Sequence, residues 1–550
     1  MITKYIANTN IGTYFTQGKV YELEQDKDGT LYFIDDEPSR HEVSRRWLDE
    51  NFFAKVPAQR KTIFPATLLC DFYKISHMIQ YPFSTEFIYS TWTPRSNKYF
   101  PQAEKVVVFG VQSTIKKYII DYFNEHFFSR PLFEVVEEYK RVLKHTLGNQ
   151  NPDASHIEAL HNLGYLPIRI KALKEGTRVP MKTPIVTIEN THKDFFWLTN
   201  YLETLLSNEF WLPMTSATIA YEYRQLLNDF AILTTGSTAG VEFQGHDFSM
   251  RGMGALEASI SSGAGHLLSF SGTDTIPSIM MLEKYYNANI EEEMVGTSIP
   301  ATEHSVMCSY GQTNEFDLFK HLITEVYANG FFSVVSDTWD FWKVVGEYLP
   351  KLKKEIMERD GRVVIRPDSG DPVKILCGDP NGATELERKG LIECLWDIFG
   401  GTITDQGYKL LDTHIGAIYG DSITLERARD IVTQLEAKGF ASTNVVFGIG
   451  SFTYQYNTRD TFGFAMKATY AQVDGEERLL FKDPKTDDGT KKSQRGRVHV
   501  HEGPDGEIKF VDGLFKDQTV KTPDLLETVF EDGELLRDQT LAEIREILHG

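Results

Sequence analysis

Four aspartates stand just after short apolar runs, where a strand would end and a loop begin. They are Asp274, Asp337, Asp368 and Asp421. Carboxylates in such loops can accept hydrogen bonds from sugar hydroxyls or help to hold Mg²⁺. Basic residues stand at comparable junctions, namely Arg251, His304 and Arg366. Because a guanidinium binds phosphate through two parallel hydrogen bonds, this combination indicates a ligand that carries both sugar and phosphate.

Two glycine-containing loops add to the same chemistry. They are Gly420-Asp421-Ser422 and Gly448-Ile449-Gly450-Ser451. Glycine lets the backbone approach a ligand closely, so that backbone N–H groups can cradle a phosphate. Each feature alone has a simpler explanation, because a strand-end aspartate often only caps the next helix and a single histidine is more often structural. Their recurrence at successive strand ends favours a phosphorylated sugar, with additional phosphate, as the ligand.

The elements that must position these residues repeat between about residues 243 and 452. Short apolar runs end in small and polar residues and then give way to a helix, as in 363–370 and 415–422. This rhythm predicts a parallel sheet with crossover helices, and a barrel of that kind gathers its loops at one end, where active sites lie. An open doubly wound sheet is the alternative. The loop at Gly448 lacks the third glycine of GxGxxG, and no GxxxxGK(S/T) occurs, so a dinucleotide fold and a P-loop enzyme are disfavoured.

The chain divides by pattern into four stretches. The pattern of residues 1–58 predicts a small β-rich N-terminal appendage, with a hairpin at 20–35 and a short amphipathic helix at 39–53. We expect this appendage to have a structural or oligomerisation role. Residues 59–240 predict a mixed α+β region, and residues 241–455 the barrel-like α/β core. Residues 456–550 predict two β-hairpins and a closing helix at 540–548 that complete the mixed domain.

The composition excludes several classes of protein. The 550 residues include 78 acidic and 57 basic side chains, with a formal net charge of −21, so the summed field repels nucleic acid and anionic membranes. No apolar run approaches the roughly 20 residues of a membrane span, and the N-terminus does not resemble a secretory signal. The four cysteines lie far apart without a CxxC pair, which is typical of reduced thiols. We expect a soluble, cytoplasmic protein.

A series of short motifs runs in order between about residues 62 and 547. They are CDFYKISHMIQYP (70–82), GHDFSMRG (245–252), FSGTDT (270–275), IPATEHS (299–305), SVVSDTWD (333–340), IRPDSGDP (365–372), YGDS (419–422), FGIGS (447–451), TRDTFGFAMK (458–467) and FKDP (481–484). In these motifs the chain resembles the nicotinamide phosphoribosyltransferase family, of the type II phosphoribosyltransferases. The resemblance implies an α/β fold: a (β/α) barrel-like phosphoribosyltransferase core with an additional mixed α+β domain, preceded here by the small β-rich appendage.

The resemblance implies transfer of the phosphoribosyl group from 5-phosphoribosyl 1-pyrophosphate to nicotinamide, giving nicotinamide mononucleotide and pyrophosphate. Mg²⁺ would be carried mainly by the substrate pyrophosphate, without a metal site of the protein's own. The pyridine nitrogen would displace pyrophosphate from C1 of the ribose, so that catalysis rests on positioning and on stabilising the leaving charge. In the family, ATP phosphorylates the histidine that corresponds to His304, with Glu303 and Asp337 beside it. Facultative ATP hydrolysis is therefore implied, and the alternative is that His304 only contacts pyrophosphate.

The resemblance also implies which residues bind nicotinamide. Phe248 would stack on one face of the ring, and Tyr73 of the partner subunit would stack on the other, in a homodimer. Asp274 would accept a hydrogen bond from the carboxamide NH₂. Arg251 and Arg366 would lie near the amide and the phosphates. The implied catalytic residues are Arg366, His304, Glu303 and Asp337.

A larger set is implied for phosphoribosyl pyrophosphate. Its members are Arg251, Arg366, Asp368, Gly420, Asp421, Gly450, Ser451, Arg459, Lys467, Lys482 and Lys491. The two aspartates would bind ribose hydroxyls, and the glycine loops would meet the 5′-phosphate through backbone N–H groups. Arg459, Lys467 and Lys482 would reach across the dimer. Positive charge is densest between residues 459 and 497, so this part of an otherwise acidic protein could bind an anionic substrate.

Two alternatives remain beside this interpretation. A nicotinate phosphoribosyltransferase would set the nicotinate carboxylate against Asp274, and like charges ~4 Å apart repel by about 4 kcal/mol at an effective dielectric of ~20. A non-catalytic protein on the same fold is the other, and the intact arginine, aspartate and histidine set argues against it. Ser451 stands where the family pattern has glycine and Ala465 where it has serine, so phosphate contacts there are expected to be weaker or rerouted.

Overall fold

A computed structural model describes residues 3–7, 11, 13–17, 19–28, 30–36, 39–44, 47–48, 51–55, 64–148, 151–481 and 494–550. The chain forms two compact units. One comprises Met1–Asp71 and Asp121–Leu166, and the other comprises Phe72–Ile120 and Pro167–Gly550. No helix among the described residues is long and apolar enough to span a membrane.

The first unit begins with a five-stranded antiparallel sheet in the order β4-β3-β2-β1-β5. Its strands are β1 (Thr3–Ala7), β2 (Val20–Gln25), β3 (Leu31–Ile34), β4 (Arg40–Glu42) and β5 (Phe52–Lys55). The predicted hairpin is confirmed by the pairing of β2 with β3. The predicted helix over 39–53 is confirmed only in its middle, where Trp47, Leu48 and Asn51 are helical and Leu48 N donates to Ser44 O at 3.0 Å. Its ends form β4, which pairs with β3, and β5, which pairs with β1. Backbone pairing with neighbouring strands overrides the local helical periodicity there.

The other regular elements described in this unit are helices. Its main elements are η1 (Ala66–Leu68), η3 (Asn124–Phe128), α5 (Leu132–Thr146) and α6 (Ser155–Leu163). In α5, Val135, Val136, Tyr139 and Leu143 recur on one face and are buried, which is the pattern of an amphipathic helix packed on a core.

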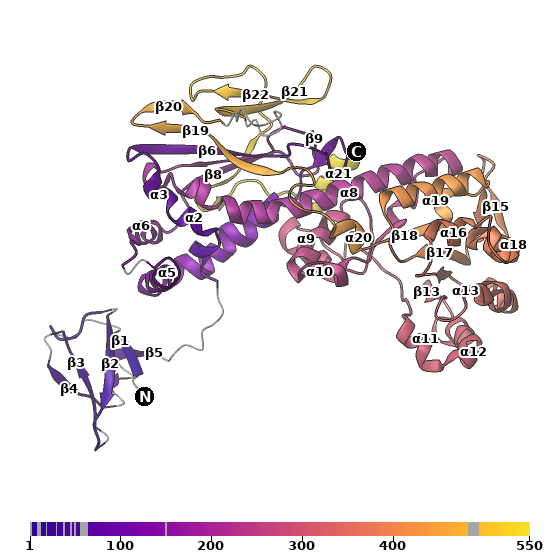
Figure 1. Cartoon of the computed structure of the whole chain (residues 1–550), viewed down its shortest axis with the longest axis horizontal. Helices are drawn as coiled ribbons and strands as arrows, with labels where there is room; N and C mark the ends of the chain where they lie inside the picture. Colours follow the sequence, from indigo (N-terminus) through magenta and orange to yellow (C-terminus); the bar gives the residue numbers. More distant parts are fainter. Residues whose placement is uncertain are drawn as a thin grey trace. The chain divides into compact units, whose positions relative to one another are not determined.

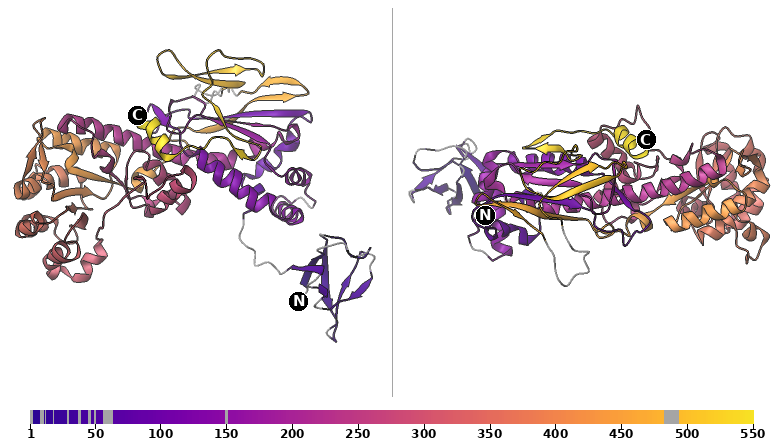
Figure 2. Two further views of the ribbon diagram at one scale, coloured as in Figure 1. Left: turned by 180° about the vertical axis from the view of Figure 1, so that it is seen from behind. Right: turned by 90° about the horizontal axis from the view of Figure 1, so that it is seen from above.

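The second unit contains a seven-stranded antiparallel sheet in the order β20-β19-β6-β10-β8-β23-β24. Its strands are β6 (Thr85–Thr93), β8 (Ile168–Ala172), β10 (Val186–Asn190), β19 (Ala465–Val473), β20 (Glu476–Leu479), β23 (Glu527–Glu531) and β24 (Glu534–Leu535). Strands from early and late in the chain alternate, so that orange and yellow ribbons lie beside purple ones (Figure 1; Figure 2). The predicted hairpins are present as β19–β20 and as β21 (Arg497–Glu502) with β22 (Ile508–Leu514).

A six-stranded sheet in the same unit is parallel throughout, in the order β12-β11-β18-β17-β14-β13. Its strands are β11 (Gly245–Asp247), β12 (Gly272–Thr273), β13 (Phe332–Val335), β14 (Val363–Arg366), β17 (Ile415–Tyr419) and β18 (Val445–Ile449). The segment 297–302 hydrogen-bonds to both edges: Thr273 N donates to Thr297 O at 2.9 Å, and Ser333 N donates to Pro300 O at 2.8 Å. The sheet is curled, which confirms the predicted barrel-like core.

Helices flank both sheets. The α-helices are α2 (Phe72–Ile75), α3 (His77–Gln80), α4 (Val111–Thr114), α7 (Leu198–Tyr201), α8 (Glu203–Thr235), α9 (Leu256–His266), α10 (Ile276–Tyr286), α11 (His304–Tyr310), α12 (Glu315–His321), α13 (Phe341–Lys343), α14 (Leu349–Lys351), α15 (Lys353–Met357), α16 (Pro372–Cys377), α17 (Glu385–Lys389), α18 (Leu391–Phe399), α19 (Leu425–Ala437), α20 (Ser451–Tyr454) and α21 (Leu541–His549). The long α8 packs against both α9 and α19. The α19 helix begins at the N-cap Thr424 and is followed by Gly439 with φ 75°, as its sequence pattern predicts.

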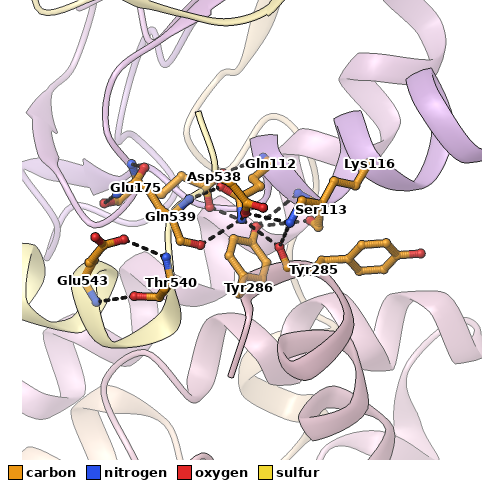
Figure 3. A network of polar contacts seen from close by, with 10 residues as sticks. All are labelled: Gln112, Ser113, Lys116, Glu175, Tyr285, Tyr286, Asp538, Gln539, Thr540 and Glu543. Carbon is orange, nitrogen blue, oxygen red and sulfur yellow. Dashed lines mark hydrogen bonds and ion pairs between the residues drawn. The ribbon is translucent and has the colours of Figure 1, made fainter. Parts of the chain in front are cut away.

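A buried polar network fastens the C-terminal segment to this unit (Figure 3). The Glu175 carboxylate accepts hydrogen bonds from the backbone N–H groups of Gly110 and Gln112, at 3.0 and 2.6 Å, and from the Tyr286 hydroxyl at 2.9 Å. Gln539 N donates to the side-chain oxygen of Gln112 at 2.7 Å. Burial raises the pKa of Glu175, and these donors oppose that rise.

Candidate functional site

The carboxyl ends of the six parallel strands bring together most of the predicted site residues. In strand order, the residues at or just beyond these ends are Asp274, Phe248, Gly450, Gly420, Asp421, Arg366, Asp368 and Asp337. The segment that joins the two sheet edges adds Ser298 at one side and His304, the first residue of α11, at the other. One edge of one sheet therefore carries carboxylates, a guanidinium, an imidazole and two glycine loops.

One corner of this edge has the features expected for binding an aromatic amide. Phe248 packs over Gly448, where a Cβ atom would lie only 2.6 Å from the ring. The ring of His246 lies 4.7 Å from that of Phe248, and its Nε2 is 2.8 Å from Asp274 Oδ1. The Ser298 hydroxyl donates to the same oxygen at 2.7 Å.

Asp274 is held as an anion in this corner. Burial alone would raise its pKa, but the hydrogen bonds from His246 and Ser298, together with the positive charge of Arg366, lower the pKa below its ordinary value. The carboxylate can therefore accept a hydrogen bond from a ligand N–H group at neutral pH, and it would repel a ligand carboxylate.

At the opposite side, Asp337 connects three loops. Its Oδ1 lies 3.2 Å from Nε2 of His304, whose side chain is 49% exposed. Its Oδ2 accepts hydrogen bonds from the backbone N–H of Asp368 at 3.0 Å and from the Ser369 hydroxyl at 2.5 Å. Glu303 contacts the Ser305 hydroxyl. Asp337 is thus the residue that orients the histidine, and the side chain of Glu303 turns to its own helix.

Arg366 and Asp368 lie between these two corners. The Arg366 Nη2 donates to Thr302 O at 2.8 Å, and its Nε is 3.3 Å from Asp368 Oδ2. Burial raises the pKa of Asp368; Arg366 opposes the rise, and the charges of Asp337 and Asp421 add to it. The Oδ1 atom of Asp368 is buried without a hydrogen-bond partner among the described residues. This concentration of negative charge suits sugar hydroxyls or a cation.

The glycine loops stand next to these carboxylates. A Cβ atom at Gly420 would lie 2.2 Å from Asp368 Oδ1, so only glycine lets that carboxylate take its position. Gly450 has open space around it and precedes Ser451 at the start of α20. Ser451, which departs from the family pattern, packs its hydroxyl where a Cβ atom at Gly252 would fall, at 2.1 Å. The adjacent Arg251 is exposed and has no hydrogen bond or ion pair among the described residues.

Of the remaining predicted residues, Tyr73 and Lys467 form a second group. Tyr73 on α2 is 56% exposed, and the neighbouring Lys74 is paired with Glu203 at the start of α8. Lys467 on β19 lies 3.6 Å from the other oxygen of Glu203. Arg459 is half-exposed, approaches Asp460 at 3.7 Å and does not belong to this group. It lies two residues after Asn457, whose side-chain amide donates to Thr453 O at 2.7 Å, close to Ser451. Lys482 and Lys491 lie outside the described residues.

The two groups are far apart within one chain. Glu203, which contacts Lys467, begins α8, and Tyr223 lies 20 residues further along the same helix. The Tyr223 hydroxyl is 3.1 Å from that of Thr453, two residues beyond Ser451. At about 1.5 Å per residue, the groups are separated by about 30 Å along the helix.

Three contacts of the site could not be derived from the pattern of the sequence. His246 and Ser298 both reach Asp274, and Ser369 reaches Asp337. His246 and Ser369 lie inside motifs of the site and Ser298 directly precedes one, which is the signal that could have identified them. The pairing partners, however, follow from the register of β11 on β12 and of β13 on β14.

The chain matches two family models. Residues 243–534 match the nicotinate phosphoribosyltransferase (NAPRTase) family, and residues 66–170 match the N-terminal domain of nicotinamide phosphoribosyltransferase. A solved nicotinate-nucleotide pyrophosphorylase from Pyrococcus furiosus shares the fold, with 15% identity and a TM-score of 0.51 over 88% of this chain and 94% of the other.

Two bacterial relatives are closer in sequence. The chain is 51% identical to a nicotinamide phosphoribosyltransferase of Acinetobacter baylyi, over 87% of this chain and 96% of the relative. It is 34% identical to one from Xanthomonas campestris, over 86% and 96%. The chain therefore belongs to the nicotinamide phosphoribosyltransferase family and is a phosphoribosyltransferase.

Proposed function

We propose that the chain transfers the phosphoribosyl group from 5-phosphoribosyl 1-pyrophosphate to nicotinamide, giving nicotinamide mononucleotide and pyrophosphate in the salvage of NAD. The observation that carries this proposal is the anionic Asp274 beside Phe248, on the same sheet edge as the phosphate loops. An amide offers N–H groups to Asp274, whereas nicotinate offers a repelled carboxylate.

The reaction requires positioning more than covalent chemistry. Phe248 and Asp274 would hold the ring so that its nitrogen faces C1 of the ribose, and Asp368 and Asp421 would hold the ribose hydroxyls. Arg251 and Arg366 would stabilise the pyrophosphate as it leaves. Ser451 and the backbone of Gly450 would meet the 5′-phosphate, with Ser451 accommodated by Gly252.

Mg²⁺ is proposed to enter with the substrate. Most of its ligands would come from the pyrophosphate oxygens. The unpartnered Oδ1 of Asp368, with Asp337 and Asp421 nearby, fits such a cation from the protein side. Bound there, Mg²⁺ would neutralise charge on the leaving group.

His304 is proposed to accept a phosphoryl group from ATP. The exposed ring with Asp337 behind its Nε2 supports this role, because a carboxylate hydrogen-bonded to an imidazole fixes its orientation. The reaction would then proceed without ATP and be favoured by it. Contact of His304 with pyrophosphate alone is the alternative.

The working enzyme is proposed to be a cytoplasmic homodimer. The separation of about 30 Å between the two groups of residues supports a site shared by two chains. Tyr73, Arg459 and Lys467 of the partner subunit would complete the site, with Lys482 and Lys491 of the basic segment.

The test is mononucleotide formation from 5-phosphoribosyl 1-pyrophosphate and Mg²⁺, with nicotinamide or nicotinate, each with and without ATP. The proposal expects product from nicotinamide and an increase with ATP. Product from nicotinate alone would overturn the assignment of the base, and no product from either would favour a non-catalytic protein. Product from nicotinamide that ATP does not change would overturn the role of His304 only.

A further inference from the structure

His246 contacts both side chains that are proposed to bind the nicotinamide ring. Its Nε2 lies 2.8 Å from Asp274 Oδ1, and its ring centroid lies 4.7 Å from that of Phe248. The His246 side chain is only 11% exposed, so solvent does not compete strongly for these contacts. Neither contact is needed to build the parallel sheet, whose ladder uses only backbone groups.

The fold holds this imidazole in one place. His246 pairs with Gly272 on the neighbouring strand β12. A Cβ atom at Gly272 would lie 2.7 Å from His246 Nδ1, so the ring rests against the bare backbone of that glycine. Rotation of the ring away from Asp274 is limited on this side, and Phe248 limits it on the other.

The hydrogen-bond chemistry determines which atom of Asp274 is left for a ligand. An ionised carboxylate can only accept, so Nε2 of His246 carries the proton and donates to Oδ1. The Ser298 hydroxyl donates to the same atom at 2.7 Å. Among the described residues no hydrogen bond reaches Oδ2, and the Asp274 side chain is 48% exposed. Oδ2 is therefore the acceptor that remains open.

We propose that His246 is a positioning residue for base recognition: through its Nε2–H it keeps Asp274 ionised and turns Oδ2 toward the ligand, so that the site takes a carboxamide and refuses a carboxylate. This inference rests on the proposed function, because it assumes that the base is bound at Asp274. It assigns the selectivity to a pair of residues on adjacent strands and not to Asp274 alone.

Protonation of Asp274 is the step that His246 prevents. Burial favours the neutral acid, and His246, Ser298 and Arg366 oppose it. A neutral Asp274 could donate a hydrogen bond to the carboxylate of nicotinate, so selectivity would fall as the pH falls. With His246 in place, Asp274 stays ionised near neutral pH and has no proton to donate to that carboxylate.

Other titratable groups near this corner have partners of their own. On β11, Asp247 accepts from Ser249 N and from the Thr275 hydroxyl, both at 2.8 Å. On α9, His266 lies 2.7 Å from the Tyr454 hydroxyl and 2.9 Å from Gly272 O. Arg366 of β14 acts on Asp274 from the other side. None of these groups changes in the substitutions below, so they cannot account for a difference between them.

The chain offers a matched pair of variants at this position. The side-chain amide nitrogen of glutamine can occupy the place of the imidazole Nε2, whereas that of asparagine corresponds to Nδ1 and is too short to reach Asp274. His246→Gln therefore keeps the donor and His246→Asn loses it, although both variants are polar and uncharged. Their comparison removes the general effects of losing the imidazole.

The experiment measures kcat/KM for nicotinamide and for nicotinate between pH 5.5 and 8 in the wild type and both variants. For His246→Asn we expect kcat/KM for nicotinamide to fall about tenfold or more. We also expect its preference over nicotinate to decrease further as the pH falls. His246→Gln should retain most of the preference throughout this pH range, and KM for 5-phosphoribosyl 1-pyrophosphate should change little in either variant.

Two outcomes would overturn the inference. If both variants kept the wild-type preference and its pH profile, His246 would have no part in base selection. If both lost activity equally, with equal losses of thermal stability, its role would be structural only. The wild type distinguishes this result from a failure of the proposed function. If the proposed function were wrong, the wild type itself would yield no mononucleotide from nicotinamide, and both claims would be overturned.

Discussion

At the scale of single residues, the missing side chain of Gly420 lets Asp368 occupy its place. Gly420→Ala would set a methyl group 2.2 Å from Asp368 Oδ1, so that the carboxylate must move. We expect KM for 5-phosphoribosyl 1-pyrophosphate to rise about tenfold or more, since hydrogen bonds to a charged group are lost. Steady-state kinetics at saturating nicotinamide measure this.

Gly254→Ala is the matched control for that substitution. The added methyl group would meet no atom closer than 3.5 Å, so KM should stay within twofold of the wild type. Equal effects of the two substitutions would show that backbone flexibility, and not the place of Asp368, sets substrate affinity.

Asp368 is expected to cost stability in the free enzyme. Its pKa is raised in the folded state, mainly by burial. Its favourable contribution to the free energy of unfolding is therefore complete only at a pH below its pKa in the unfolded chain, and it is lost as the pH rises through its pKa in the folded state. Asp368→Asn should therefore raise the free energy of unfolding near pH 7 by about 1 kcal/mol while turnover falls at least a hundredfold. Thermal unfolding at pH 4 and pH 7 tests this, and a variant less stable at pH 7 contradicts it.

Individual residues differed in how well the sequence predicted their place. The strand-end aspartates could be found because each follows an apolar run, and they do gather on one edge. His246 could not be assigned to Asp274, because 28 residues separate them and only strand register brings them together. The motif around Glu303 suggested contact with the histidine, yet its carboxylate bonds within its own helix.

At the scale of elements, the buried Glu175 network joins α4, α10 and the C-terminal segment (Figure 3). Glu175→Ala would leave the N–H groups of Gly110 and Gln112 and the Tyr286 hydroxyl without their acceptor. We expect the free energy of unfolding to fall by about 2–4 kcal/mol, with kcat per folded molecule unchanged. Denaturant titration and active-site normalised rates measure both.

The capping box of α21 provides an exposed hydrogen-bonded carboxylate with which the loss of stability in Glu175→Ala can be compared. Glu543 accepts from the Thr540 N–H at 2.8 Å at an exposed helix start, so Glu543→Ala should cost only about 1 kcal/mol. If the two losses were equal, the buried network would contribute no more than an ordinary helix cap.

Elements were predictable where their signal is local. The repeating strand–loop–helix rhythm, the terminal hairpins and α19 all follow from periodicity and turn residues. The predicted helix over 39–53 is too long because its ends pair with β3 and β1, and such partners are not local. The alternation of early and late strands in the seven-stranded sheet could not be predicted either, because those strand partners are also distant in the sequence.

At the scale of the whole molecule, the distance between the two groups of site residues predicts complementation between chains. Phe248→Ala and Lys467→Ala should each be nearly inactive alone. If the two variants are dissociated and mixed at random, half of the dimers that form are heterodimers, and each heterodimer has one intact site out of two. About a quarter of the wild-type activity should therefore return. A mixture no more active than its components would contradict a site shared by two subunits.

The central claim is that the anionic Asp274 selects nicotinamide over nicotinate, and the most direct measurement is the ratio of their kcat/KM values in the wild type and in Asp274→Asn. Removing the charge abolishes a repulsion of up to about 4 kcal/mol, so the ratio should fall by about a hundredfold or more, with nicotinate gaining and nicotinamide losing. An unchanged ratio, or a wild type that prefers nicotinate, would contradict the account.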